Sequence, residues 1–180
     1  MTAANADKWS AAYLKAQRTA SWAKTMTRVL ITQSTVNQPK WEVVNFLGPK
    51  KVESRGIVDL IAIRRDHTRG EEPLQLGDLF EIVLIQVKGG SARMPTAKDN
   101  VRLAAVGKHY SARAILLAEW KQGTRVKLRR LGDDLQWSSD AVDPQSIFAP
   151  KRVKTPTNKG TEAVAVKSKV RRIVGSSSEP

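Results

Sequence analysis

The sequence predicts one α/β domain with a central mixed sheet flanked by helices, followed by a basic tail. Apolar runs of strand length alternate with two helical stretches in the order α-β-β-β-α-β-β. The 180 residues suffice for one domain with a sizeable core and a tail. Hydrophobic residues make up 41% of the chain, which is typical of a globular protein.

The first predicted element is a helix over residues 7–34. Apolar side chains recur there at steps of four and three, which places them on one helical face: Trp9, Tyr13, Ala16, Ala20 and Ala23. We expect this stripe to contact the core, and a platform for stacking bases is the alternative.

Strands are predicted over residues 41–47, 57–64 and 79–88, with a polar loop over 65–77. A helix is predicted over 96–109, with Pro95 ahead of it and Thr96 as its N-cap. Two further strands are expected over 112–120 and 125–131.

The predicted domain spans residues 1–140, and residues 141–180 form the tail. From Lys151 to Pro180 there are eight basic and two acidic residues, a net charge of +6, and no aromatic residue. Such a segment cannot bury enough apolar area to offset its chain entropy, so the tail is predicted to be disordered. We expect it to add sequence-independent affinity for a polyanion.

The net charge of +14 favours a polyanionic partner, and nucleic acid above all. A protein that is merely basic and soluble is the alternative. The absence of cysteine excludes disulfides and thiolate metal sites. With no apolar run of membrane-spanning length and no secretory signal, we expect no membrane partner and an intracellular location, either cytoplasmic or associated with a nucleoid or nucleus.

Three neighbouring features carry the candidate chemistry. Asp59 is an acid inside an otherwise apolar strand, where a charge needs a partner or a metal ion. Gln86 and Lys88 stand two residues apart on the next strand and therefore share one sheet face. Gly89 and Gly90 then remove side-chain bulk, so that a ligand backbone can approach.

These groups suit the hydrolysis of a phosphodiester. A hard cation, Mg²⁺ or Mn²⁺, needs oxygen ligands, which the Asp59 carboxylate, the Gln86 amide and the Val87 carbonyl can supply. Lys88 would orient the attacking water or offset charge on the phosphate. The alternative for Asp59 alone is a buried carboxylate satisfied by structural partners.

The stretch from Glu53 to Ala62, ESRGIVDLIA, followed by LIQVKG at residues 84–89, resembles the PD-(D/E)XK nuclease superfamily and, within it, the archaeal Holliday-junction resolvases. The resemblance covers residues 19–131. It implies a restriction-endonuclease-like αβββαβ core and a metal-dependent nuclease.

On that resemblance Asp59 and Lys88 match the Asp and Lys of the motif, whereas Gln86 stands where the family has Glu or Asp, a QxK variant. The family also carries an acid on its first helix, where this chain offers only Asp7. Glu53 is the candidate catalytic substitute, and a simple turn position is the alternative.

The nucleic-acid contacts are expected at two places. Ser54 and Arg55, with the glycine after them, resemble the polar stretch that meets a phosphate in resolvases, and a tight turn is the alternative. Gly89 lies next to the motif. Lys98 and Arg102 on the helix over 96–109 could flank a duplex, with a solvated helix face as the alternative.

The sequence therefore predicts a Mg²⁺- or Mn²⁺-dependent endonuclease that acts on DNA, with branched or junction DNA as one substrate form. A resolvase of this kind would act as a homodimer. The alternatives are a nucleic-acid-binding module that keeps the nuclease fold without the chemistry, and a basic RNA-associated factor. DNA and RNA cannot be told apart from these residues.

Overall fold

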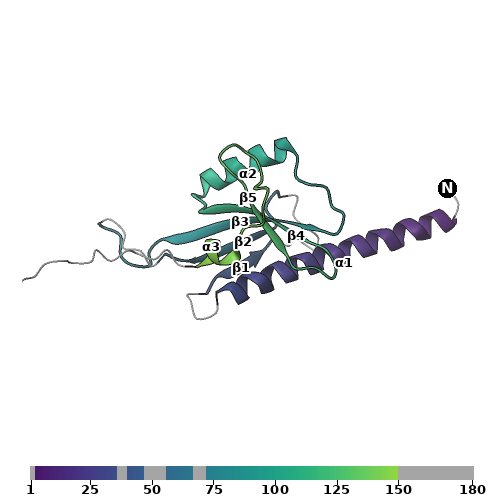
Figure 1. Cartoon of the computed structure of the whole chain (residues 1–180), viewed down its shortest axis with the longest axis horizontal. Helices are drawn as coiled ribbons and strands as arrows, with labels where there is room; N and C mark the ends of the chain where they lie inside the picture. The colour runs from purple at the N-terminus through teal and green to yellow at the C-terminus, as the bar shows by residue number, and fades with distance from the viewer. Residues whose placement is uncertain (1–2, 36–39, 47–55, 67–71, 150–180) are drawn as a thin grey trace, which may run out of the picture.

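Helices cover both faces of a single five-stranded sheet in the computed structural model, which describes residues 3–35, 40–46, 56–66 and 72–149 (Figure 1). The elements are α1 (Ala3–Ser34), β1 (Glu42–Asn45), β2 (Leu60–Arg65), β3 (Phe80–Gly89), α2 (Ala97–His109), β4 (Ala114–Trp120), β5 (Lys127–Arg130) and α3 (Pro144–Phe148). The α/β class, the mixed sheet and the order of the first seven elements confirm the prediction.

The strand order β1-β2-β3-β4-β5 follows the sequence. All neighbours are antiparallel except β3 and β4, which are parallel because α2 crosses over between them. Leu60 at the start of β2 pairs with Asn45 at the end of β1 and with Ile85 near the end of β3. The end of β1, the start of β2 and the ends of β3 and β4 therefore lie together, at what we call the site edge.

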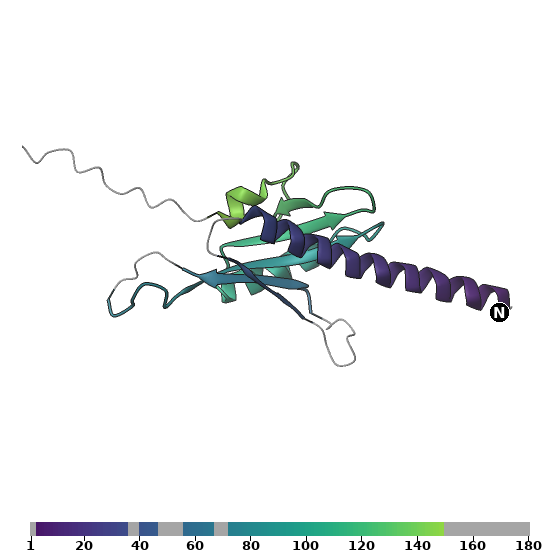
Figure 2. The same ribbon diagram turned by 90° about the horizontal axis from the view of Figure 1, so that it is seen from below.

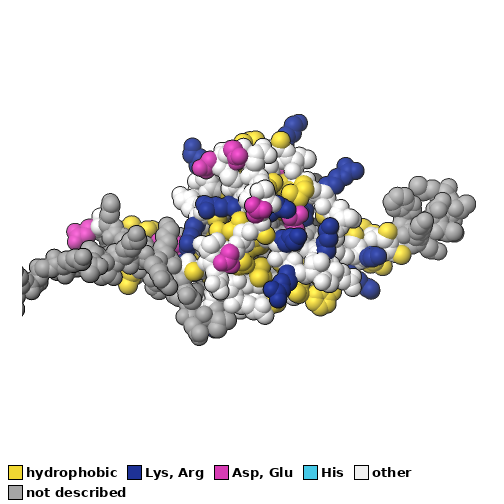
Figure 3. Space-filling view, viewed as in Figure 1, with side chains coloured by type: hydrophobic (Ala, Val, Ile, Leu, Met, Phe, Trp, Pro, Cys, Tyr) yellow, Lys and Arg dark blue, Asp and Glu magenta, His cyan; other side chains and the backbone are white. Residues whose placement is uncertain are grey.

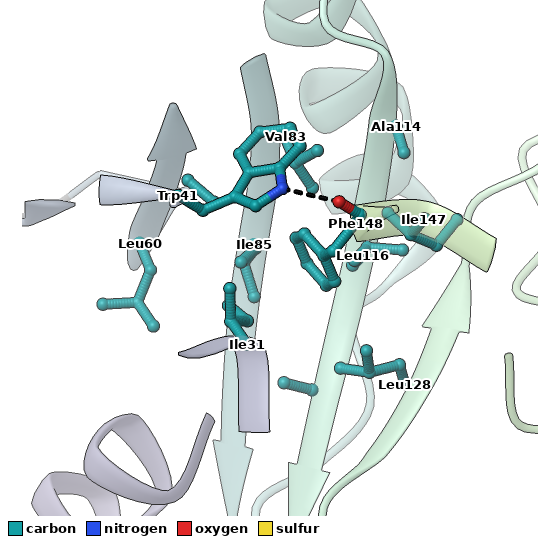
Figure 4. Packing of buried hydrophobic residues seen from close by; sticks show 12 residues of the cluster. Ile31, Trp41, Leu60, Val83, Ile85, Ala114, Leu116, Leu128, Ile147 and Phe148 are labelled. Atoms are coloured by element: carbon teal, nitrogen blue, oxygen red, sulfur yellow. Dashed lines mark hydrogen bonds between the residues drawn. The ribbon is translucent and has the colours of Figure 1, made fainter. Parts of the chain in front are cut away.

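Helices α1 and α3 pack on one face of the sheet and enclose its main core (Figures 1 and 4). This core includes side chains from α1, from four strands and from α3: Ile31, Trp41, Leu60, Ala62, Val83, Ile85, Ala114, Leu116, Ala118, Leu128, Ile147 and Phe148. Because side chains alternate along a strand, the residues between these, such as Leu84 and Gln86, point to the opposite face.

Helix α2 covers that opposite face. Leu103 of α2 is fully buried, as are Leu84 and Leu117 of the sheet. A Cβ added at Gly107 would lie 2.5 Å from Ile115 Cδ1 and 4.0 Å from Leu84 Cδ1, so the bare glycine lets the helix lie close to the strands.

Only the C-terminal half of α1 packs on the sheet. Ala23 is fully buried, but Tyr13 is 64% exposed and Ala16 is exposed, so the predicted core role of the apolar stripe is wrong for these two residues. The side chain of Trp9 lies outside the described part. The sheet ends beneath α1 at the site edge, and the N-terminal half of the helix projects beyond the body (Figures 1 and 2).

The core extends further along the chain than predicted. Ile147 and Phe148 of α3 are 5% and 0% exposed, so the domain boundary expected after residue 140 falls too early. The backbone oxygen of Phe148 accepts hydrogen bonds from Trp41 Nε1 at 2.8 Å and from Arg64 Nη1 at 2.9 Å. These long-range contacts hold α3 on the core, although the local composition there resembles that of a tail. Residues 150–180 of the predicted tail lie outside the described residues.

Candidate functional site

Asp59 lies directly ahead of β2, at the site edge, and its carboxylate completes the pairing between two strands. The Asp59 backbone N–H donates to Ile85 O at 3.0 Å. In turn the Val87 N–H donates to the Asp59 carboxylate, at 2.7 Å from Oδ2, rather than to a backbone carbonyl. The carboxylate is therefore held against the β3 backbone at Val87, the residue between Gln86 and Lys88.

Lys24 of α1 brings a positive charge to this carboxylate. Its Nζ lies 3.7 Å from Asp59 Oδ1, and the two side chains are 9% and 22% exposed. Lys24 is placed there because its neighbours on α1, Ala23 and Thr27, are fully buried against the body. The sequence interpretation did not single out Lys24; the available signal was a lysine on the apolar side of a helix.

Gln86 and Lys88 share the sheet face that α2 covers, in line with the expected alternation. Gln86 is 8% exposed, and its buried Oε1 has no hydrogen-bond partner. Hydrogen bonds from the Thr96 backbone and hydroxyl hold the pKa of Asp99, in the first turn of α2, below its usual value of 3.8. The charges of Arg102 and Lys88 also contribute to lowering this pKa.

The structure does not bring all the predicted catalytic groups into contact with one another. Neither a hydrogen bond nor an ion pair connects Asp59 with Lys88, both of which are described. Among the described residues, no three His, Asp or Glu side chains gather as a metal site would require. Glu81 lies toward the other end of β3 and pairs with Arg64 and Arg113. Glu53, Ser54 and Arg55 lie outside the described residues.

A second amide oxygen without a donor lies at the same edge. Asn45 Oδ1 and Gln86 Oε1 are the two buried side-chain polar atoms without a partner in the described part of the chain. Asn45 pairs with Leu60, next to Asp59, and was not among the predicted site residues. Its only sequence signal was a polar residue near the end of an apolar strand.

Helix α1 occupies the space that Gly89 leaves. A Cβ built on Gly89 would lie 3.0 Å from Thr19 O and 3.2 Å from Ala23 Cβ. The absent side chain thus allows close packing of α1, where we had expected the approach of a ligand. Lys98 and Arg102 are exposed on α2, and Arg102 Nη1 lies 3.9 Å from Asp99 Oδ1.

Comparisons with known proteins add no family to this description. No protein-family model matches the chain, and no curated protein is detectably similar to it. No helix in the described residues is long and apolar enough to cross a bilayer.

Proposed function

We propose that this chain is a nuclease of the PD-(D/E)XK type, which binds DNA and hydrolyses its phosphodiester bonds with Mg²⁺ or Mn²⁺ at the site edge. One observation carries the proposal: the Asp59 carboxylate is hydrogen-bonded to Val87, and the next residue, Gln86, has a buried amide oxygen without a donor. Leaving a buried acceptor unsatisfied costs about 1–3 kcal/mol, which a bound cation would recover.

The residues present fit a hard divalent cation. Asp59, Gln86 and the Val87 carbonyl would hold it, and all three offer oxygen, the element that Mg²⁺ prefers. When bound, the cation would polarise a phosphate and make water a stronger nucleophile at neutral pH. The buried Gln86 oxygen without a donor supports this assignment more strongly than the sequence motif alone.

The protein groups have separate tasks in this proposal. The Val87 N–H holds the Asp59 carboxylate in one orientation, so that it need not reorganise when the substrate arrives. The ammonium groups of Lys88 and Lys24 offset the negative charge that develops on the phosphate. The αβββαβ order of the elements agrees with the restriction-endonuclease-like core that the resemblance implies.

A second candidate is a binding module that keeps the nuclease fold without the chemistry. The observation in its favour is the ion pair of Asp59 with Lys24, together with a neutral Gln86. An ion pair and a neutral amide offer a cation less negative charge than the two carboxylates that the motif usually supplies.

A cleavage assay tests the proposal. The wild type is incubated with labelled duplex, single-stranded and four-way-junction DNA, in Mg²⁺, in Mn²⁺ and in EDTA. We expect cleavage only with a metal ion, with the junction as the substrate form to try first. Asp59→Ala and Lys88→Ala should each lower the rate by about 10²–10³ or more while DNA binding persists, because these groups act chiefly in the transition state.

Exposed residues of the same kinds serve as controls. Asp133→Ala and Lys108→Ala remove a carboxylate and an ammonium from exposed positions outside the proposed metal site, and should leave the rate unchanged. If the wild type binds DNA but cuts no form with either metal ion, the nuclease proposal fails and the binding module replaces it.

A further inference from the structure

The projecting half of α1 is solvated on all sides. Every described side chain from Ser10 to Arg18 is exposed, a length of about 13 Å at 1.5 Å per residue. Figures 1 and 2 show this half extending past the sheet, with no other described element beside it. An isolated helical half of this kind gains no core contacts, so its surface chemistry is free to serve a partner.

One face of α1 carries basic residues from Lys15 to Arg28. Exposed residues follow one another there at steps of three and four, which aligns them on the side away from Ala23 and Thr27: Lys15, Arg18, Trp22, Thr25 and Arg28. We call this set the basic face. The sequence has no acidic residue between Asp7 and Glu42, and Figure 3 shows no acidic side chain on the described part of the projecting helix.

The basic face has the composition of a surface that follows a nucleic-acid strand. Trp22 is 58% exposed beside Arg18, and an aromatic ring among cations suits the stacking of bases. Arg28 and Thr25 line a shallow hollow of about 450 Å³ one turn further on. From Lys15 to Arg28 the face spans about 20 Å and carries three cations.

The helix passes directly over the site edge. Thr19 lies against Gly89 and Gly90, and Lys24 reaches Asp59. The basic face lies on the opposite side of the helix from these contacts and stays exposed where α1 crosses the site edge.

We propose that the basic face of α1 binds the phosphate backbone of a nucleic acid. The proposal takes from the proposed function only that the ligand is nucleic acid. Charge complementarity selects this occupant over a second copy of the chain, because two such helices would bring like charges together. Binding through α1 does not require cleavage.

The test measures binding without cleavage. The affinity of the full chain for a labelled duplex is measured in EDTA at increasing salt, for DNA and for RNA of the same sequence. The variant Lys15→Gln/Arg18→Gln/Arg28→Gln is compared with Arg65→Gln/Lys108→Gln/Arg130→Gln. The second triple removes the same charge from exposed positions toward the opposite end of the sheet. Glutamine retains good helix propensity, and circular dichroism verifies the helix.

We expect the α1 triple to flatten the slope of log K against log salt by up to about 2.7, at 0.9 for each lost phosphate contact, and the control triple to leave it near the wild-type value. Equal slopes for both triples would overturn the proposal. If the α1 triple does not fold, Arg18→Gln on the fully exposed half should still lower the slope by about 0.9.

Two further outcomes separate the alternatives. A wild type that sediments as a dimer, with an α1 triple that is monomeric yet keeps the wild-type salt slope, would assign the basic face to a second copy and overturn the proposal. A chain that never cuts DNA but loses affinity through the α1 triple would refute the nuclease and support the basic face as a binding surface.

Discussion

Buried oxygens without donors mark the site edge more clearly than its charges do. Asn45 Oδ1 and Gln86 Oε1 are both buried, yet neither accepts a hydrogen bond. Most buried polar atoms in proteins have a partner, so the Gln86 oxygen calls for an explanation such as a bound ion. Asn45 shares the opposite face of the sheet with its register partner Leu60. Asp59 differs from both amides because the Val87 N–H already satisfies one of its oxygens.

The variant Gln86→Glu tests this explanation at the level of one residue. A carboxylate in place of the amide adds a negative charge where we place the cation, so Mg²⁺ should bind more tightly and cleavage should persist or rise. The readout is the melting temperature against Mg²⁺ concentration, because a ligand that binds only the folded state stabilises it by mass action.

Asn100→Asp is the matched control for that variant. Asn100 is also buried, at 6% exposure, but its amide is satisfied by Leu135 O and by Trp137 Nε1. A carboxylate there should destabilise the fold without any gain from Mg²⁺. A Gln86→Glu protein that folds but binds Mg²⁺ more weakly than the wild type would remove Gln86 from the metal site.

At the scale of an element, α2 begins with a complete capping box. Thr96 accepts a hydrogen bond from the Asp99 N–H, and the Asp99 carboxylate accepts from the Thr96 N–H at 2.9 Å. The Thr96 bonds, with smaller contributions from Arg102 and Lys88, hold the pKa of Asp99 below 3.8. A carboxyl whose pKa is lowered by folding stabilises the folded state while it is ionised.

Asp99→Ala should therefore lower stability at neutral pH. The difference from the wild type should shrink as the pH falls below 3.8 and through the folded pKa, because the wild-type carboxyl then loses its charge. Denaturant titrations at several pH values measure this difference. Asp133→Ala, at an exposed position, should stay within about 0.5 kcal/mol of the wild type. A stability difference between Asp99→Ala and the wild type that stays constant from pH 7 to pH 2 would contradict the assigned role of the Asp99 charge.

The same helix shows why parts of the fold could be predicted from sequence. Its cap and its apolar spacing are local signals, and the structure confirms Thr96 as the N-cap. The strands were also predictable to within a few residues, because apolar runs bounded by glycine or proline are local. The place where the sheet ends beneath α1 could not be predicted, because no local pattern near Tyr13 depends on the length of the sheet.

The candidate site was predictable to a lesser degree. The shared face of Gln86 and Lys88 follows from strand alternation. The ion pair of Lys24 with Asp59 joins a helix to a strand far along the chain, and no local pattern encodes it. Asn45 likewise acquires its place only through pairing with Leu60.

At the scale of the whole molecule, a buried ion pair connects the sheet to α3 through Arg64. Glu81 in β3 pairs with Arg64 of β2 at 2.5 Å and with Arg113, just ahead of β4, at 3.0 Å. Arg64 also stacks on Trp41, 4.5 Å from the ring centroid, and donates to the Phe148 oxygen. The network lies toward the end of the sheet opposite the site edge, so it can be tested without touching the candidate chemistry.

Glu81→Gln should destabilise the protein by about 3–5 kcal/mol, because removing one partner leaves the buried Arg64 without its counter-charge. Denaturant unfolding measures the loss, and a cycle with Arg64→Met separates the pair from its surroundings. The double variant should lose less stability than the two single variants together, since the arginine that would lack its counter-charge is then absent. Additive losses would mean that the pair does not act as a unit. At a temperature where Glu81→Gln is still folded, its affinity for DNA should equal that of the wild type, because the network stabilises the body and takes no part in binding.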